Sequence, residues 1–370
     1  MINKKNCLLF IWFITLILLV VCTFIFTKVT KLDDELYNKM YEASNLANVA
    51  YGKIKEYKIN QGIEISEDDI LKSGMIGSSK RTAITTTEGV LEAKRTTCNP
   101  EWAGMIVRIM YENGIKENDK VGAIFSGSFP ALNICVMAAF QVYNVESIIF
   151  ASIGASYYGA NQEDCTFFDM CEYLKECNVF NKTVDYFSLG GADDIGNDFH
   201  NVNVRTNIIN KIKASNVNYI EIENYKENID YRLNILKDNI NEMKLFINCG
   251  GTLVAYGEGL DAFSKTGFIK GSNVIASFNQ IINNRNSKMG LLECIHRLGI
   301  DILSMKDIKT LSIKYGLPYD PVKIEIGSSD VFYKKKYNIV FPIIGVVFSI
   351  GCLIYWFIYR KNLFNKKVKL

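Results

Sequence analysis

The sequence predicts an α/β protein with a mostly parallel, Rossmann-like sheet, flanking helices and a transmembrane helix at each end. Uncharged runs occupy residues 7–27 and 338–359, and each is long enough for a helix that crosses the hydrocarbon core of a bilayer. From Pro100 onward, helical patterns alternate with short, continuously apolar strands, which is typical of a buried parallel sheet. The sheet forms one domain or two lobes that divide near residue 245.

Charge around the two uncharged runs predicts a direction in the membrane. The N-terminal residues 1–6 and the basic tail 360–370 together carry seven Lys or Arg residues and no acid, whereas residues 28–336 carry a net charge of −4. Basic tails favour the cytoplasm. We therefore expect a two-span protein of the cell membrane, with cytoplasmic termini and an extracytoplasmic central domain, although the lysines at 334–336 weaken the asymmetry.

An amphipathic helix is predicted over residues 30–60, directly after the first uncharged run. Apolar residues recur there every three or four positions and form one stripe. The stripe consists of Leu32, Leu36, Met40, Ala43, Ala47, Ala50 and Ile54. We expect it to pack on the central domain or on a partner helix. Residues 62–80 predict a loop with a short helix after Ser66, and the α/β domain is predicted over residues 74–330.

Helices and strands alternate through the predicted domain. Asn99 and Pro100 form a start signal for one helix, and Asn113-Gly114 forms its end signal. Helices are predicted over 101–112, 130–143, 166–176, 208–214, 230–242 and 288–298. Strands are predicted over 120–125, 147–152, 183–189, 245–248, 252–256 and 273–277.

No metal site is predicted. Seven cysteines lie outside the two uncharged runs, and an odd number cannot all pair within one chain. Cys165, Cys171 and Cys177 are six residues apart, so on a helix they would point about 120° from one another. Zinc ligands need closer CxxC-like spacing or convergent faces. With only His200 and His296 in the chain, a histidine metal site or a Ser-His-Asp triad is not indicated.

Four turns of small, polar residues each follow a predicted strand, at 126–130, 152–161, 188–196 and 248–252. Open parallel sheets bind ligands beyond the carboxyl ends of their strands. Four such turns at one edge predict a cleft rich in backbone N–H donors, and the helix start at Pro130 would attract an anion. The predicted ligand-binding residues of these turns are Gly127, Ser156, Gly190, Gly191, Asp194, Gly250, Gly251 and Thr252. The alternative for the first turn is that Gly127 only makes the bend and Ser128 caps the helix.

Ser126, Ser128 and Asp193 are the candidate catalytic residues. Either serine could act as a nucleophile if a base lies within reach, and Lys94 and Asp193 are candidates for that base. Asp193 or Asp194 could bind a metal, orient a hydroxyl or accept a proton, or one of them could cap the next helix. GxGxxG and GxxxxGK[ST] patterns are missing, so no dinucleotide or Walker-type site is predicted and any cofactor stays unknown.

A hydroxyl cluster precedes two basic residues near the start of the domain. Thr85, Thr86 and Thr87 are followed by Lys94 and Arg95. Hydroxyl groups beside Lys and Arg suit the recognition of a carboxylate or a phosphate. We therefore include all five as predicted ligand-binding residues, with a solvated β-edge segment as the alternative.

Several of these segments together resemble the poly-γ-glutamate system protein family, which is associated with bacterial synthesis and export of poly-γ-glutamate. The resemblance extends over residues 74–300 or so and is carried by TTTEGVLEAKRTTCNPEWA, SGSFPALN, SIGASYYGAN, SLGGADDIG and NCGG. It implies a role in making or exporting this polymer at the cell surface, with subunits of a membrane synthase as partners. It supplies no catalytic residues.

Three functions are compatible with these observations. The first is a membrane-anchored accessory protein that binds the anionic polymer or a glutamyl intermediate in the Gly/Ser-rich cleft. The second is a poly-γ-glutamate hydrolase or γ-glutamyl transferase with a serine nucleophile. The third is a non-catalytic scaffold that holds synthase subunits together. A nucleic-acid partner is not predicted, because the central part is slightly acidic and no basic–aromatic motif is present.

Overall fold

The computed structural model describes residues 10, 12–17, 28–258, 263–336 and 340–367. They belong to two compact units. The larger unit is Asp33–Phe332, and the smaller one is formed by both ends of the chain, Met1–Leu32 and Tyr333–Leu370. In the smaller unit, β1 (Lys28–Lys31) pairs antiparallel with β9 (Tyr333–Lys336), and α13 spans Val340–Lys367.

The prediction of a two-span membrane protein is wrong. Within the described ranges, no helix is both long enough and apolar enough to cross a membrane. Most of the first predicted span, residues 7–27, lies outside the described residues. The second corresponds to part of α13, where Gly345, Ser349 and Gly351 interrupt the large apolar residues.

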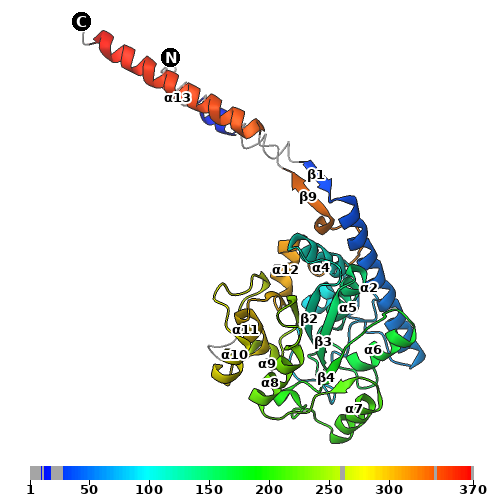
Figure 1. The fold of residues 1–370 in the computed structure, drawn as a ribbon. Helices are drawn as coiled ribbons and strands as arrows, with labels where there is room; N and C mark the ends of the chain where they lie inside the picture. Colours follow the sequence, from blue (N-terminus) through cyan, green and yellow to red (C-terminus); the bar gives the residue numbers. More distant parts are fainter. Residues whose placement is uncertain (1–9, 11, 18–27, 259–262, 337–339, 368–370) are drawn as a thin grey trace. The chain divides into compact units, whose positions relative to one another are not determined.

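The larger unit contains one seven-stranded sheet, in the order β5-β4-β3-β2-β6-β8-β7 (Figure 1). Neighbouring strands are parallel except for the β7–β8 pair. The strands are β2 (Lys120–Ser126), β3 (Glu146–Ser152), β4 (Tyr186–Ser188), β5 (Asn218–Tyr219), β6 (Met243–Cys249), β7 (Gly267–Ile269) and β8 (Asp301–Met305). The α/β prediction is confirmed. The sheet continues across residue 245, so the two-lobe alternative does not hold for this unit.

Strand order defines where a ligand site is expected. The chain begins the sheet with β2, adds β3, β4 and β5 on one side, and then returns to the other side of β2 with β6. The direction of winding therefore reverses between β2 and β6. In open α/β sheets, the crevice beyond the carboxyl ends of the strands at such a reversal is the usual ligand site.

Helices cover both faces of the sheet. On one side lie α2 (Asp34–Asn60), α4 (Glu101–Glu112), α5 (Pro130–Tyr143) and α6 (Phe167–Glu176); on the other lie α8 (Tyr225–Leu236), α9 (Leu253–Tyr256), α10 (Phe278–Asn284) and α11 (Leu291–Arg297) (Figure 1). The side chains of successive strand residues point to opposite faces of the sheet. Phe125 packs on Phe167 of α6, whereas Ile124 and Phe246 join the core with α8 and α11.

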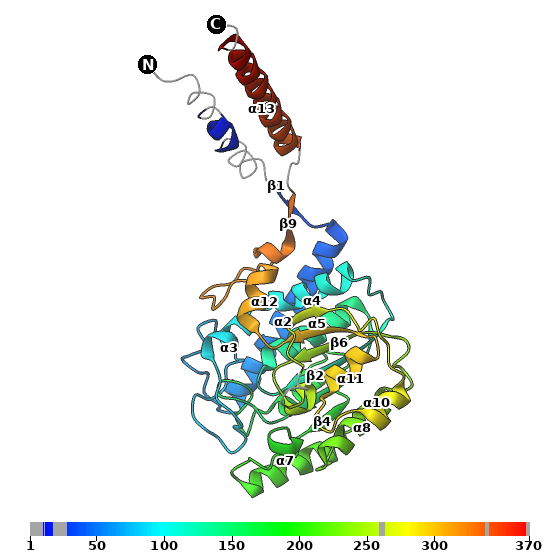
Figure 2. The ribbon, with the colours of Figure 1, turned by 90° about the vertical axis from the view of Figure 1, so that its left-hand side faces the viewer.

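Three further helices lie outside these groups. They are α3 (Leu91–Thr97), α7 (Val202–Ala214) and α12 (Ile308–Tyr315). Helices α3 and α12 pack against each other near the carboxyl ends of the strands (Figure 2). This pairing brings residues 85–97, which precede α4 in the chain, to the same edge as the end of β8.

The predicted amphipathic helix is confirmed as α2. Its apolar stripe is buried against α4 and α5, so it packs on its own domain rather than on a partner. Tyr37 of α2 also stacks edge-on against Phe332, with ring centroids 5.4 Å apart. Glu101 of α4 accepts hydrogen bonds from the amides of Gly327 and Ser329. The first helix and the last residues of the unit are thereby joined in one core.

Local signals predicted most elements but failed at some. Helices 101–112 and 130–143 have the predicted bounds. The predicted strand 252–256 is instead helix α9, because the Thr252 hydroxyl accepts the Ala255 amide and caps a helical turn. The predicted strand 273–277 is not a strand, and Ser277 begins α10 through a capping box with Gln280. The expected helix after Ser66 is only a turn.

Candidate functional site

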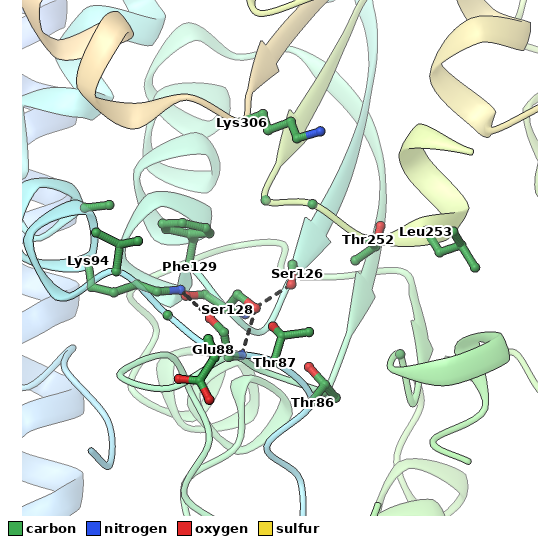
Figure 3. Close-up of a pocket in the computed structure, with 18 of the residues that line it drawn as sticks. Thr86, Thr87, Glu88, Lys94, Ser126, Ser128, Phe129, Thr252, Leu253 and Lys306 are labelled. Carbon is green, nitrogen blue, oxygen red and sulfur yellow. Dashed lines mark hydrogen bonds between the residues drawn. The ribbon is translucent and has the colours of Figure 1, made fainter. Parts of the chain in front are cut away.

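A cavity of ≈ 850 Å³ lies at the carboxyl ends of β2, β3, β4, β6 and β8 (Figure 3). The turns after these strands and the segment that precedes and enters α3 form its walls. The cavity thus occupies the reversal point of the sheet, as the strand order leads one to expect. Its volume is within the ordinary range for sites that bind small ligands.

The turn after β2 holds Ser126, Gly127 and Ser128. The Ser128 amide donates to Ser126 Oγ at 3.2 Å, and the Gly127 amide donates to the Ser152 carbonyl at 2.9 Å. A Cβ at Gly127 would lie 2.3 Å from the Ile153 carbonyl oxygen, so this position requires glycine. Ser128 does not cap α5, because the N-cap residue is Phe129 and no side chain caps that helix.

Lys94 of α3 enters the cavity wall and is only 3 % exposed. Its Nζ donates to Ser156 Oγ at 2.7 Å and to the backbone carbonyl of Ser128, and it lies 3.7 Å from the ring centroid of Phe129 (Figure 3). Burial lowers the pKa of Lys94 from 10.5 to about 7, and the nearby Cys98 thiol offsets only part of that effect. This lysine forms no ion pair among the described residues.

Ser156 lies in the turn after β3 and is held from several directions. Its amide donates to Ser128 Oγ at 2.9 Å. The same turn receives the threonine segment: the Thr86 amide donates to the Ala155 carbonyl at 2.9 Å, and the Tyr157 amide donates to the Thr87 carbonyl at 3.1 Å. The threonine segment and the turn that holds Ser156 therefore lie side by side at this edge of the sheet.

Two members of the predicted 85–95 cluster do not line the cavity. Thr85 is buried, and its Oγ1 accepts hydrogen bonds from the Thr82 amide and from Asn161 Nδ2. Arg95 points to the other side of α3, where Nε and a terminal nitrogen each lie 2.6 Å from the Asp320 carboxylate. That pairing raises the pKa of Arg95. Thr86, Thr87 and Lys94 remain in the cavity wall.

The two aspartates after β4 differ in position. Asp194 lines the cavity but is occupied: Ser188 Oγ donates to one carboxylate oxygen at 2.8 Å, and Arg232 donates to the other at 2.7 Å. Asp193 is exposed, accepts a hydrogen bond from Asn197 at 2.9 Å and does not line the cavity. The prediction of Asp193 as a catalytic base is not supported by this geometry. The preceding glycines, Gly190 and Gly191, line the cavity and have positive φ.

The turn after β6 closes the opposite side of the reversal point. Gly250 has a φ of +95°, and a Cβ there would lie 2.7 Å from the Ser126 Cβ. The amides of Gly250 and Gly251 donate to no acceptor within the described part of the chain. Gly251 faces open space, since a Cβ there would meet nothing within 4 Å. Thr252 lines the cavity and also caps α9.

Sequence reasoning missed the wall that follows β8. Lys306, Asp307, Lys309 and Tyr319 line the cavity there. The Asp307 carboxylate caps α12 through the Thr310 amide and hydroxyl, and these bonds lower its pKa. The missed signal was the short apolar run before Lys306, followed by an aspartate three residues before a threonine.

Other chemistry-bearing residues are dispersed. Within the described ranges, no group of three or more His, Cys, Asp or Glu residues could hold a metal ion. The described cysteines are free thiols, and Cys165 and Cys171 are buried.

Comparison of the chain with protein-family models, curated proteins and solved structures finds no match.

Proposed function

We propose that the cavity binds an anionic ligand of the γ-glutamyl type, in an accessory protein of poly-γ-glutamate synthesis or export. The observation that supports this proposal is an imbalance in the cavity wall. Most of its carboxylates are held by donors of the protein, whereas its lysines have no carboxylate partner among the residues that the structure describes.

The acids of the wall are largely occupied. Asp194 is paired with Arg232, Asp307 accepts two hydrogen bonds from Thr310, and Asp198 accepts the Ala192 amide at 3.0 Å. A carboxylate that already accepts hydrogen bonds from buried or ordered donors competes poorly for a ligand cation. Glu88 is the remaining acid of the wall.

The lysines of the wall are placed differently. Lys306 lies 4.5 Å from the Tyr256 ring centroid, and Lys309 lies 5.5 Å from that of Tyr319. Together with Lys94, they pair with no carboxylate among the residues that the structure describes. Cations that line a concave, partly desolvated site attract anions and raise their local concentration.

A γ-linked glutamyl chain suits this arrangement. Each residue of such a chain presents one carboxylate and one amide. The carboxylates can pair with the lysines after β8, while the unpaired amides of Gly250 and Gly251 can donate to carbonyl oxygens. The resemblance of residues 74–300 to the poly-γ-glutamate system proteins supplies the choice of this anion over others.

The test is equilibrium binding of a short oligo-γ-glutamate to the full chain, at low and at high NaCl concentration. We expect measurable binding that weakens with salt, and weaker binding of the uncharged oligo-γ-glutamine. Replacing both Lys306 and Lys309 by alanine should weaken binding about tenfold or more, as expected for about 1.4 kcal/mol or more of lost interaction.

Gly251→Val provides a steric test, because its side chain would project into the open cavity. It should abolish binding while leaving the fold intact. Gly52→Val is the matched control, since a side chain at this exposed position of α2 also meets nothing within 4 Å. If the wild-type chain fails to bind the oligomer at low salt, or if both valine variants bind equally well, the proposal is wrong.

A further inference from the structure

The geometry points to a catalytic pair in this cavity: Ser156 as nucleophile and Lys94 as its general base, for acyl transfer at an amide bond of the bound ligand. The inference rests on the proposed function for its ligand class. It differs from the sequence-based candidates, which were Ser126 and Ser128.

Contacts select Ser156 among the serines of the wall. Lys94 Nζ lies 2.7 Å from Ser156 Oγ, within hydrogen-bonding reach of a nucleophile and its base. Ser126 Oγ and Ser128 Oγ instead accept backbone amides, from Ser128 and Ser156 respectively. Within the described part of the chain, neither of these two hydroxyls forms a hydrogen bond with a basic side chain.

Burial and hydrogen bonds fix the positions of Lys94 and Ser156. Lys94 is 3 % exposed and Ser156 is 5 % exposed, and both line the cavity. The second bond of Lys94, to the Ser128 carbonyl, fixes the end of its flexible side chain. The amide of Ser156 is anchored on Ser128 Oγ, so the turn after β2 orients both members of the pair.

Lys94 can act as a base because no carboxylate among the described residues pairs with its ammonium form. The titratable groups around it are the thiol of Cys98, the C-cap residue of α3, and Glu88 in the same wall, and neither forms an ion pair with it. With a pKa of about 7, a substantial fraction of the amine is neutral at neutral pH. A neutral amine keeps its bond to the Ser128 carbonyl as donor and offers a lone pair to the Ser156 hydroxyl.

The proposed step conserves atoms and charge. The neutral Lys94 amine takes the Ser156 hydroxyl proton as Oγ bonds to the amide carbonyl carbon of the ligand. The carbon–nitrogen bond then breaks, and the Lys94 ammonium returns the proton to the departing amine. Water, or the amine of another chain, then attacks the resulting ester on Ser156. Lys94 takes a proton from this second nucleophile and delivers it to Ser156 Oγ. Water gives hydrolysis, whereas an amine gives transfer.

Covalent labelling of the full chain by an alkyl fluorophosphonate tests the pair without a natural substrate. Ser156 Oγ would bond to phosphorus, fluoride would leave, and Lys94 would take the proton. We expect a single adduct by intact mass that maps to Ser156, with a rate that rises with pH and levels off above about pH 8, once the amine has lost its proton.

Variants complete the test. Ser156→Ala and Lys94→Ala should each lower the labelling rate at least 100-fold, while Ser287→Ala, at an exposed position, should label like the wild type. Circular dichroism and melting temperature would show whether each variant is folded, and the pH profile of the wild type requires no variant. An adduct on Ser126 or Ser128, no adduct, or a rate independent of pH between 6 and 8 would overturn the inference.

Oligo-γ-glutamate binding and fluorophosphonate labelling, both measured on the wild type, separate the two proposals. If the wild type binds the oligomer and forms no adduct, the cavity is a binding site and the catalytic pair is wrong. If the wild type forms the Ser156 adduct and binds no oligomer, the catalytic pair stands and the proposed ligand is wrong.

Discussion

Two buried basic side chains differ in their partners: within the described residues, Arg232 pairs with a carboxylate of the cavity wall, whereas Lys94, which lines the cavity, pairs with none. Arg232 is 2 % exposed and pairs with Asp194 at 2.7 Å. Lys94 is 3 % exposed, and its Nζ hydrogen-bonds a hydroxyl and a carbonyl and lies over an aromatic ring. A buried charge beside a carboxylate is electrostatically compensated, whereas a buried amine without such a partner can lose its charge. The comparison separates a group that holds the fold from a group that is available for chemistry.

The difference follows from where each residue enters the fold. Arg232 lies on α8 and meets a turn after β4 that also supplies the Ser188 hydroxyl to the same carboxylate. Lys94 lies on the short helix α3 and meets the turns after β2 and β3, which present serines and a carbonyl. Arg95, its neighbour in sequence, points away from the cavity and forms an ion pair with Asp320.

The largest effect on stability is expected from removing Arg232 from its pair with Asp194. Arg232→Met leaves the Asp194 carboxylate buried without its cation and should lower the free energy of unfolding by about 3–5 kcal/mol. Urea unfolding followed by circular dichroism measures this loss. Arg297→Met, which removes an exposed partner of Glu293, is the matched control and should cost about 0.5 kcal/mol or less. A loss below about 1 kcal/mol for Arg232→Met would remove the distinction between Arg232 and Lys94.

A smaller, pH-dependent effect on stability is expected from Lys94, which has no carboxylate partner among the described residues. The unfolded chain keeps the Lys94 proton up to about pH 10, whereas the folded chain releases it near pH 7. Between these values the unfolded state binds more protons, so this lysine destabilises the fold below pH 7 and progressively less above it. From pH 7 to pH 9, the wild type should gain about 2 kcal/mol of stability relative to Lys94→Met.

The measurement for this prediction is urea unfolding of both proteins at several pH values. Other titrating groups are common to the two chains, so their contributions cancel in the difference. Lys323→Met, at an exposed position, serves as the control substitution. A wild-type minus variant difference that stays constant from pH 6 to pH 9 would mean that Lys94 keeps its proton throughout, and that it resembles Arg232 after all.

The smallest effect is expected at the partly exposed pair on the far side of α3. A double-mutant cycle with Arg95→Met and Asp320→Asn should give a coupling energy of about 0.5–1 kcal/mol. The side chains are 16 % and 25 % exposed, so water and salt screen the pair, and added NaCl should reduce the coupling. A coupling above about 2 kcal/mol would mean that this pair resembles the buried pair of Arg232 and Asp194, and is not intermediate between that pair and the unpaired Lys94.

Local sequence signals predicted the part of the fold that depends on neighbouring residues. Pro130 and the Asn113-Gly114 pair marked helix ends because each restricts its own backbone. Apolar runs marked β2, β3 and β6 because these strands are buried on both faces. The small, polar turns were recognisable because each directly follows an apolar run in the sequence. These turns do line one cavity.

Contacts between distant segments were not predictable in this way. No local feature distinguishes Lys94 from Arg95, and only the positions of Ser156 and Asp320 in the folded chain separate their roles. The apolar run after Thr252 fits a strand and a helix equally well, and the Thr252 cap selects the helix. The wall after β8 was missed because its contribution depends on the packing of α12 against α3.

The contact between Tyr37 and Phe332 has a consequence for how the chain matures on the ribosome. Helix α2 is synthesised first in the larger unit, but part of its apolar surface is covered only by residues at the end of that unit. Until these residues emerge, that surface stays open to other chains. We therefore expect nascent chains that stop before residue 332 to depend on chaperones. A circular permutant that joins Phe332 to Asp33 would relieve that dependence.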